Sequence, residues 1–269
     1  MTAKQRYFIE LAYDGTHYHG WQIQQNAVSV QELLNNALAT ILRQPIETTG
    51  CGRTDTGVHA REFFAHFDVD EDHGSWTVDH SKKIGGNEPS TINHQLRGLN
   101  SLLPPDIAIK NIIPVHNNAH ARFDATQRSY QYHIHFHKDP FLHGYSWMVR
   151  DVPDMVLMNQ AAAIIIEYTD FSCFSKSNTQ VKTNNCKITR AEWVKTEQGI
   201  VFHISADRFL RNMVRAIVGT LIMVGKHEIE PEAVRAIIES KNRSNAGTSV
   251  PACGLYLTEV KYSFLVSSS

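Results

Sequence analysis

The chain has 269 residues, of which 42% are hydrophobic and 20% charged, and its formal net charge is −1. This composition is typical of a soluble globular protein and excludes a disordered or collagen-like chain. The near-neutral charge also excludes a protein that is basic over its whole surface, although a local cluster of positive charge would be enough to bind phosphates. No apolar run approaches the roughly 18 residues that span a bilayer, so we expect no contact with membranes.

The N-terminal part of the chain predicts a strand followed by a helix. Residues 6–15 (RYFIELAYDG) alternate apolar side chains with a period of two, which is typical of a half-buried strand. Ser29 and Glu32 have the spacing of a capping box, and the residues behind them form one apolar helical stripe that Pro45 ends. No apolar signal segment precedes the strand, and the four cysteines are scattered, so we expect a cytoplasmic protein.

Two more strands are predicted on either side of a tight connection. Residues 46–51 (IETTGC) and 61–69 (REFFAHFDV) have the composition of strands, and residues 52–60 (GRTDTGVHA) connect them. Residues 71–90 resemble a surface insertion. A further strand at residues 128–138 (RSYQYHIHFHK) would link this part to the second half of the chain.

The second half predicts a helix, a hairpin, a second helix and a closing strand. The helices are expected at residues 153–166 and 211–225, and the hairpin should turn near Gln198 and Gly199. A short helix is expected behind Pro231. Residues 254–264 (GLYLTEVKYSF) then read as the last strand.

The order of these elements predicts an α+β protein. We expect two related α+β modules, with mainly antiparallel sheets joined into one extended sheet and an active-site cleft between the modules. The N-terminal module would comprise residues 1–110, a connecting strand segment residues 111–150, and the C-terminal module residues 151–269.

The connection at residues 52–60 concentrates polar side chains where core packing gives them no role. Its centre, Asp55-Thr56-Gly57, is the tripeptide of aspartic proteases, but those enzymes need two carboxylates that share a proton, and no second such tripeptide occurs. Arg53 would leave the same face of an extended segment as Asp55 and would favour a permanently ionised carboxylate. An Asp that caps a turn before Gly57 is the structural alternative. We predict that Asp55 is a catalytic carboxylate on a loop.

Two clusters of basic residues could bind nucleic acid, although for each a solvated surface is the alternative. The first is the set Lys176, Lys182, Lys187 and Arg190, and the second is Arg208, Arg211 and Arg215. The acidic run at residues 68–72 indicates where a phosphate would not bind.

One strand carries three histidines at alternating positions: His133, His135 and His137. Histidines on one strand face can bind zinc, but no cysteine or carboxylate accompanies them, and we interpret them as partly exposed polar residues of a sheet. The four cysteines also lack metal-ligand spacing, so we expect no metal site.

Several segments of the chain, in order, resemble the motifs of the TruA family of tRNA pseudouridine synthases. GRTDTGVHA is similar to the family's GRTD-x-GVH motif and AYDGTHYHGWQIQ to its YDG-x-x-Y-x-GWQ-x-Q opening. The other similar segments are LNSLLPPDIAI, HARFDATQRSYQYHI, YTDFSCFSK, RFLRNMVRAIVG and TSVPACGLYLTEVKY. Thr56, where the family commonly has Ala, and the insertion at residues 71–90 depart from the pattern.

The resemblance implies an isomerase that converts uridine to pseudouridine at positions 38, 39 or 40 of the tRNA anticodon stem-loop. It implies tRNA as the partner, a homodimer, and no metal or small-molecule cofactor. By the same resemblance, Asp55 is the essential catalytic residue and Arg53 helps to displace the target nucleotide. Tyr130 would stack on the flipped uracil, Arg215 would pair with the catalytic carboxylate, and Leu255 would line the base pocket.

Two other functions stay open on the sequence. A non-catalytic RNA-binding protein would keep the basic clusters and aromatic residues without needing Asp55. An aspartic protease would need a second carboxylate, which a homodimer could supply.

Overall fold

The computed structural model describes residues 4–70, 91–175 and 183–265, and of residues 91–94 only the backbone. The chain divides into two compact units. The first contains residues up to Thr56 together with Ala60–Ala125, and the second contains Gly57–His59 and the chain from Thr126 onward. The predicted insertion at residues 71–90 lies outside the described residues. The boundaries expected at residues 110 and 150 stay a prediction.

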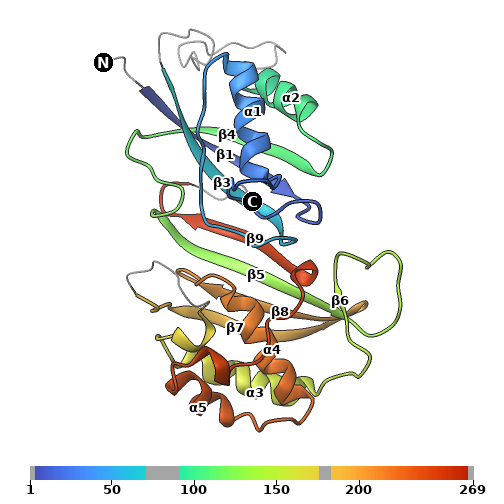
Figure 1. The fold of residues 1–269 in the computed structure, drawn as a ribbon. Coiled ribbons are helices and arrows are strands. Elements are labelled where there is room, and N and C mark those ends of the chain that lie inside the picture. Colours follow the sequence, from blue (N-terminus) through green and yellow to red (C-terminus); the bar gives the residue numbers. More distant parts are fainter. Residues whose placement is uncertain (1–3, 71–90, 176–182, 266–269) are drawn as a thin grey trace, which may run out of the picture. The chain divides into compact units, whose positions relative to one another are not determined.

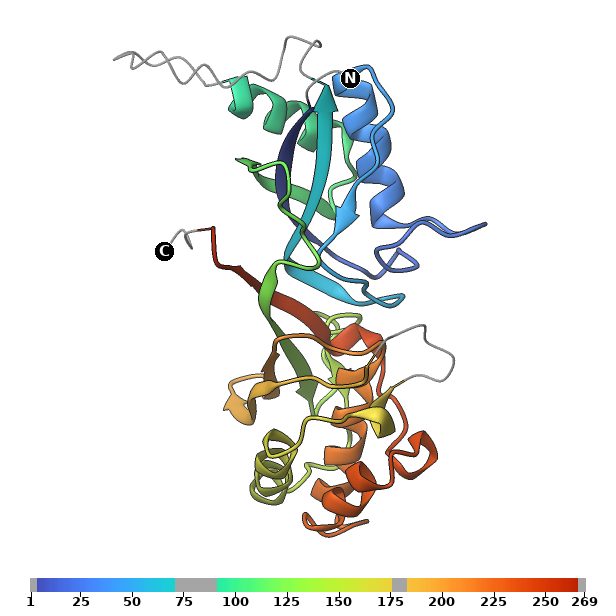
Figure 2. The same cartoon turned by 90° about the vertical axis from the view of Figure 1, so that its left-hand side faces the viewer.

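The described residues of the first unit form four strands and two helices. Its strand order is β4-β1-β3, with β2 paired to β3, and the pairs are antiparallel (Figure 2). The strands are β1 (Lys4–Tyr13), β2 (Thr49–Gly50), β3 (His59–Asp70) and β4 (Ile107–Val115). The helices α1 (Val30–Leu42) and α2 (Thr91–Leu102) lie next to each other (Figure 1).

The strand β1 is buried more completely than its alternation predicts. Tyr7, Ile9, Leu11 and Tyr13 are buried as the pattern indicates, but Phe8 on the other face is buried as well. The ring of Phe8 lies 6.2 Å from that of its cross-strand partner His66, so this second face is also packed.

The helix α1 begins where the capping box predicts. The Ser29 side chain accepts a hydrogen bond from the Glu32 amide at 3.3 Å. The helix ends at Arg43, whose φ of 54° is left-handed, two residues before Pro45.

The described residues of the second unit form five strands and three helices. The strand order is β9-β5-β8-β7, and β6 pairs with β5. The strands are β5 (Ala125–His135), β6 (Trp147–Met148), β7 (Ile188–Thr196), β8 (Gly199–Ala206) and β9 (Leu255–Tyr262). The pairs β5–β8 and β7–β8 are antiparallel, and the predicted hairpin turns between Thr196 and Gly199.

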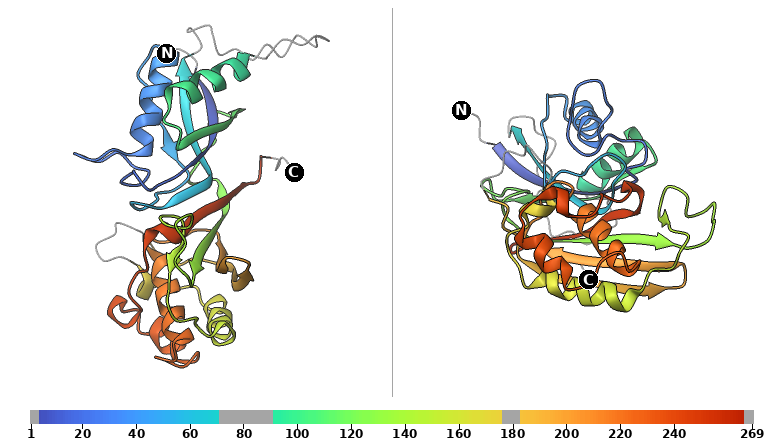
Figure 3. Two further views of the ribbon diagram at one scale, coloured as in Figure 1. Left: turned by 90° about the vertical axis from the view of Figure 1, so that its right-hand side faces the viewer. Right: turned by 60° about the horizontal axis from the view of Figure 1, so that its bottom comes forward.

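The helices of the second unit pack into one apolar core with the sheet. They are α3 (Met155–Ile166), α4 (Met213–Gly225) and α5 (Ala233–Glu239), and they lie together in Figure 3. The described residues of this unit also form the short 3-10 turns η2 (Ser172–Phe174), η3 (Arg243–Asn245) and η4 (Ala252–Gly254). The helix α4 is buried on nearly all sides, as expected for a helix that is apolar all round.

Within the described parts of the chain, no helix has both the length and the apolar character that crossing a membrane requires. The secondary structure and the antiparallel pairing confirm the predicted α+β class. The expected cleft between modules stays a prediction.

Candidate functional site

Residues of the YDG and GWQ segment support the residue that precedes Asp55. The hydroxyl of Tyr13 lies 2.9 Å from the hydroxyl of Thr54, and both groups are buried. Gly20 has a φ of +85°, and a Cβ added there would lie 2.3 Å from the Thr54 carbonyl oxygen. Trp21 is buried, with its ring stacked on Phe63 at a centroid distance of 4.2 Å. Tyr13 of the strand β1, the close backbone approach at Gly20 and the stacked ring of Trp21 therefore fix the position of the loop that carries Asp55.

The loop itself leaves two charged groups accessible. Asp55 is half-buried and Arg53 is exposed. The predicted tight turn is present, because Gly57 has a left-handed φ of +76° that a residue with a side chain adopts only with strain. Both charged residues belong to the first unit, whereas Gly57 belongs to the second.

The end of the motif is buried in the second unit. Val58 is part of that unit's apolar core, and a Cβ added to Gly57 would lie 3.4 Å from the Cβ of Ala252. His59 Nε2 lies 3.2 Å from the carbonyl oxygens of both Gly144 and Cys253. The motif pattern alone predicts no individual role for His59.

The predicted stacking residue, Tyr130, lies on β5. It is half-buried, packs on the core of the second unit, and meets the ring of Phe209 edge-on at a centroid distance of 5.1 Å. Two residues further on, Tyr132 is fully buried and donates its hydroxyl hydrogen to the Pro251 carbonyl at 2.8 Å. Tyr132 is thus a core residue, and Tyr130 keeps part of its ring exposed.

Arg215 lies in the first turn of α4 and forms two hydrogen bonds with Val250, which is distant in the sequence. Its Nε donates to the carbonyl of Val250 at 2.7 Å, and the Val250 amide donates back to the Arg215 carbonyl at 3.3 Å. A cation in the first turn of a helix opposes the helix dipole, and this turn contains no acidic residue. Helix stability therefore does not explain Arg215 at this position.

The segment before β9 is also fixed in place. Arg243 donates to the carbonyls of Ala246 and Gly247 at 3.3 and 3.0 Å and to the Ser249 hydroxyl at 3.0 Å. Leu255, the first residue of β9, is buried in the apolar core to which Tyr130 packs. Of the five predicted site residues, Tyr130, Arg215 and Leu255 thus belong to the second unit.

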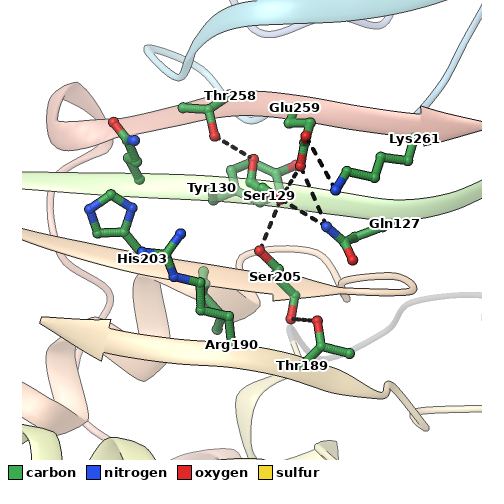
Figure 4. Close-up of a pocket in the computed structure, with 12 residues that line it drawn as sticks. Gln127, Ser129, Tyr130, Thr189, Arg190, His203, Ser205, Thr258, Glu259 and Lys261 are labelled. Atoms are coloured by element: carbon green, nitrogen blue, oxygen red, sulfur yellow. Dashed lines mark hydrogen bonds and ion pairs between the residues drawn. The ribbon is translucent and has the colours of Figure 1, made fainter. Parts of the chain in front are cut away.

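A polar pocket lies on the sheet of the second unit, and Tyr130 is one of the residues that line it (Figure 4). It has a volume of about 430 Å³, and its floor is a hydrogen-bonded set in which Ser205 Oγ lies 2.9 Å from Ser129 Oγ, which lies 3.0 Å from Glu259 Oε2. Arg190, from the first predicted basic cluster, lines this pocket and forms an ion pair with Glu192. This pairing weakens the case for the cluster as a phosphate site; Lys176 and Lys182 lie outside the described residues.

Two buried thiols of the second unit are poor nucleophiles at neutral pH. Burial raises the pKa of Cys173 and of Cys186 to about 12, so both thiols stay protonated at neutral pH. Burial also lowers the pKa of His135, whereas the neighbouring His133 places its Nε2 3.2 Å from Gln131 Oε1. Among residues that the structure describes, no group of three histidine, cysteine or acidic side chains could hold a metal ion.

The chain is similar to known proteins over nearly its whole length. A family model described as tRNA pseudouridine synthase matches residues 11–124 and 168–263. A protein of Bacteroides fragilis named tRNA pseudouridine synthase A is 49% identical over 259 residues, which cover 96% of each chain. Proteins of the same name from Porphyromonas gingivalis and Francisella tularensis are 49% and 36% identical, and the matches cover 96% and 95% of this chain and 97% and 93% of those relatives.

Proposed function

We propose a specific reaction from one established premise: the chain belongs to the tRNA pseudouridine synthase family. It is accordingly an isomerase. The reaction breaks the C1′–N1 glycosidic bond of a uridine, turns the uracil in place, and rejoins it through C5. The proposed substrates are the uridines at positions 38, 39 and 40 of the tRNA anticodon stem-loop.

A base inside a stem must leave the stack before this chemistry, at a cost of a few kcal/mol. Arg53 is proposed to occupy the vacated space, since an exposed guanidinium can stack on bases and bind phosphate. Tyr130 is proposed to stack on the flipped uracil, a contact that contributes about 1–3 kcal/mol per base. Leu255 would supply an apolar wall of the base pocket.

Asp55 is proposed as the catalytic residue. As a carboxylate it can add to the sugar or the base to form a covalent intermediate, or it can remove the C2′ proton to give a glycal. Arg215 is proposed as the ion-pair partner of this carboxylate. Its position in the first turn of α4, where a cation is unfavourable, supports a role outside the helix.

One observation carries this assignment. Asp55 is separated from Gly57 by a single residue, and Gly57–His59 belong to the unit that contains Tyr130, Arg215 and Leu255. Because consecutive α-carbons are about 3.8 Å apart, the α-carbon of Asp55 lies within about 7.6 Å of that of Gly57. The chain itself therefore ties the proposed carboxylate to the unit of the proposed base pocket.

The test replaces the carboxylate by its amide. Asp55→Asn should abolish tritium release from tRNA that carries 5-³H-uridine, while the Kd for tRNA changes by less than about threefold, since the variant loses one chemical group and not the binding surface. Asp151→Asn, an exposed position, is the control for loss of a negative charge. Full release by Asp55→Asn contradicts the assignment, and no release by the unsubstituted protein favours a non-catalytic RNA-binding protein.

We also propose that the protein acts in the cytoplasm as a homodimer. Its described cysteines are free thiols, which suits a reducing compartment, and tRNA is the proposed substrate. Sedimentation equilibrium of the purified protein tests the dimer, and a mass of one chain at all concentrations contradicts it.

A further inference from the structure

The histidine of the GRTDTGVHA segment joins two distant parts of the second unit. His59 is 2% exposed, and its Nε2 lies 3.2 Å from the carbonyl oxygen of Gly144 and 3.2 Å from that of Cys253. Carbonyl oxygens only accept hydrogen bonds, so Nε2 carries the hydrogen and shares it between the two. The two acceptors are 85 and 194 residues away in the chain.

The ring of His59 also packs against two tyrosine rings. It stacks on Tyr256 at a centroid distance of 4.6 Å and an angle of 21°, and Tyr145 lies 5.6 Å away. The hydroxyl of Tyr256 in turn donates to the Tyr145 carbonyl at 2.7 Å. The loop around Gly144 and the segment from Cys253 to Tyr256 are therefore bound to each other and to His59.

The residues on either side of these contacts belong to the proposed active site. Leu255 follows the acceptor Cys253 by two residues, and Asp55 precedes His59 by four. Between Asp55 and His59 the chain makes one left-handed turn at Gly57. A Cβ added there would lie 3.4 Å from the Cβ of Ala252, which belongs to η4 together with the acceptor Cys253. A small movement of His59 would thus shift the chain on which Asp55 is carried.

We propose that His59 is a positioning residue for pseudouridine formation, an inference that rests on the proposed function. Its shared Nε2–H fixes the end of the motif on the Gly144 and Cys253 carbonyls, and with it the loop of Asp55 and the start of β9 at Leu255. His59 itself touches no reacting atom. Its removal should therefore slow the chemical step more than it weakens tRNA binding.

The test compares a variant that keeps the ring with one that keeps the donor. His59→Phe retains an aromatic ring without a hydrogen-bond donor, and His59→Gln retains an N–H at the reach of Nε2. The readout is the single-turnover rate constant of tritium release, measured with enzyme in saturating excess over tRNA. Under this condition the rate constant stays the same even when a fraction of the enzyme molecules is unfolded. Filter binding gives the Kd for tRNA.

We expect His59→Phe to lower this rate constant by about tenfold or more, with Kd changed by less than about threefold, and His59→Gln to recover part of the loss. His135→Phe is the matched control, because His135 is another buried histidine of this unit, and its rate constant should stay at the unsubstituted value. If His59→Phe does not fold, His59→Gln should still be faster than His59→Asn, whose shorter amide cannot reach both carbonyls.

The outcomes separate the two proposals. An unchanged rate constant in His59→Phe, or equal constants in His59→Gln and His59→Asn, overturns the positioning role and leaves the proposed function standing. Absence of tritium release from the unsubstituted protein overturns the proposed function and the positioning role with it.

Discussion

The hydroxyl groups of Tyr13 and Thr54 lie 2.9 Å apart in the interior of the first unit. Thr54 immediately precedes Asp55, the proposed catalytic residue. Tyr13 ends β1, so this contact connects the rigid sheet to the loop of Asp55. The site is thereby supported by residues that never contact the substrate in our proposal.

The Tyr13–Thr54 contact should be measurable by a double-mutant cycle. Tyr13→Phe leaves the buried Thr54 hydroxyl with one partner fewer and should lower the free energy of unfolding by about 1–2 kcal/mol. Adding Thr54→Val removes the other hydroxyl, and the double variant should lose less than the sum of the single variants. Urea denaturation gives all four values; strictly additive losses would contradict the contact.

Gly20 should not tolerate a side chain. In Gly20→Ala the new Cβ meets the Thr54 carbonyl oxygen at 2.3 Å, and the left-handed φ adds strain, so we expect a loss of about 2–4 kcal/mol of unfolding free energy. Gly144 has the same φ of +85° but no atom within 4 Å of an added Cβ. Gly144→Ala should therefore lower the free energy of unfolding by only about 1–2 kcal/mol, the cost of the left-handed backbone. Equal losses in the two variants would show that the steric contact is unimportant.

Arg215 should not be replaceable by lysine. Arg215→Lys keeps the positive charge but loses the Nε donor to the Val250 carbonyl, so the charge is no longer held in one place. We expect the tritium-release rate constant to fall by about tenfold or more, since a hydrogen bond to a charged group is worth about 1.5–3 kcal/mol. The exposed Arg150→Lys serves as control. Activity of Arg215→Lys equal to that of the control would contradict the role.

The first unit should lose stability in acid because of His66. Burial, with Arg6 and His120 nearby, lowers the pKa of His66 from 6.5 to about 4 against the opposing charges of Asp68 and Asp124. The neutral ring accepts the Ala121 amide hydrogen at Nδ1, at 3.1 Å. Because the pKa is lower in the folded state, the neutral His66 ring contributes to the free energy of unfolding. This contribution is complete above pH 6.5 and is lost as the pH falls toward 4.

Between pH 7 and pH 4.5 the unfolding free energy should fall by about 2 kcal/mol from this group. His66→Asn, which keeps an acceptor but does not titrate, should show a flatter pH dependence in urea titrations. A residual slope is expected from His120, whose pKa burial also lowers. The same slope in both proteins would rule out His66 as the cause.

Two helix glycines should respond to alanine in opposite directions. In α4, a Cβ on Gly219 would lie 1.9 Å from the Thr248 carbonyl oxygen, so Gly219→Ala should destabilise the protein by about 2 kcal/mol or more. In α2, a Cβ on Gly98 meets only the end of the Ile41 side chain at 3.1 Å. Gly98→Ala should be neutral or stabilise by up to about 1 kcal/mol, because alanine favours helix. Thermal unfolding distinguishes the two, and stabilisation by Gly219→Ala would contradict the packing.

The sequence predicted elements whose signals are local. The helix start at the N-cap Ser29, the hairpin turn at Gly199 and the apolar stripe of α4 are confirmed, because caps, turns and periodicity depend on neighbouring residues. The strand expected at residues 46–51 is only the two-residue β2. Two elements of the first unit, α2 and β4, were not predicted.

The contacts around the site could not be predicted in the same way. His59 binds two main-chain carbonyls, and a carbonyl exists at every residue, so nothing in the sequence marks Gly144 or Cys253 as its partners. The pairing of Arg190 could have been found, since Glu192 stands two residues away and leaves the same face of β7. The roles of Arg53, Asp55 and Tyr130 stay predictions that kinetics must test.

The most direct test of the account maps pseudouridine along tRNA transcripts that were incubated with the purified protein. We predict conversion of uridine at positions 38, 39 and 40 of the anticodon stem-loop, and none with Asp55→Asn. Conversion confined to other positions, or the same conversion by Asp55→Asn, would contradict the proposed reaction site or its catalytic residue.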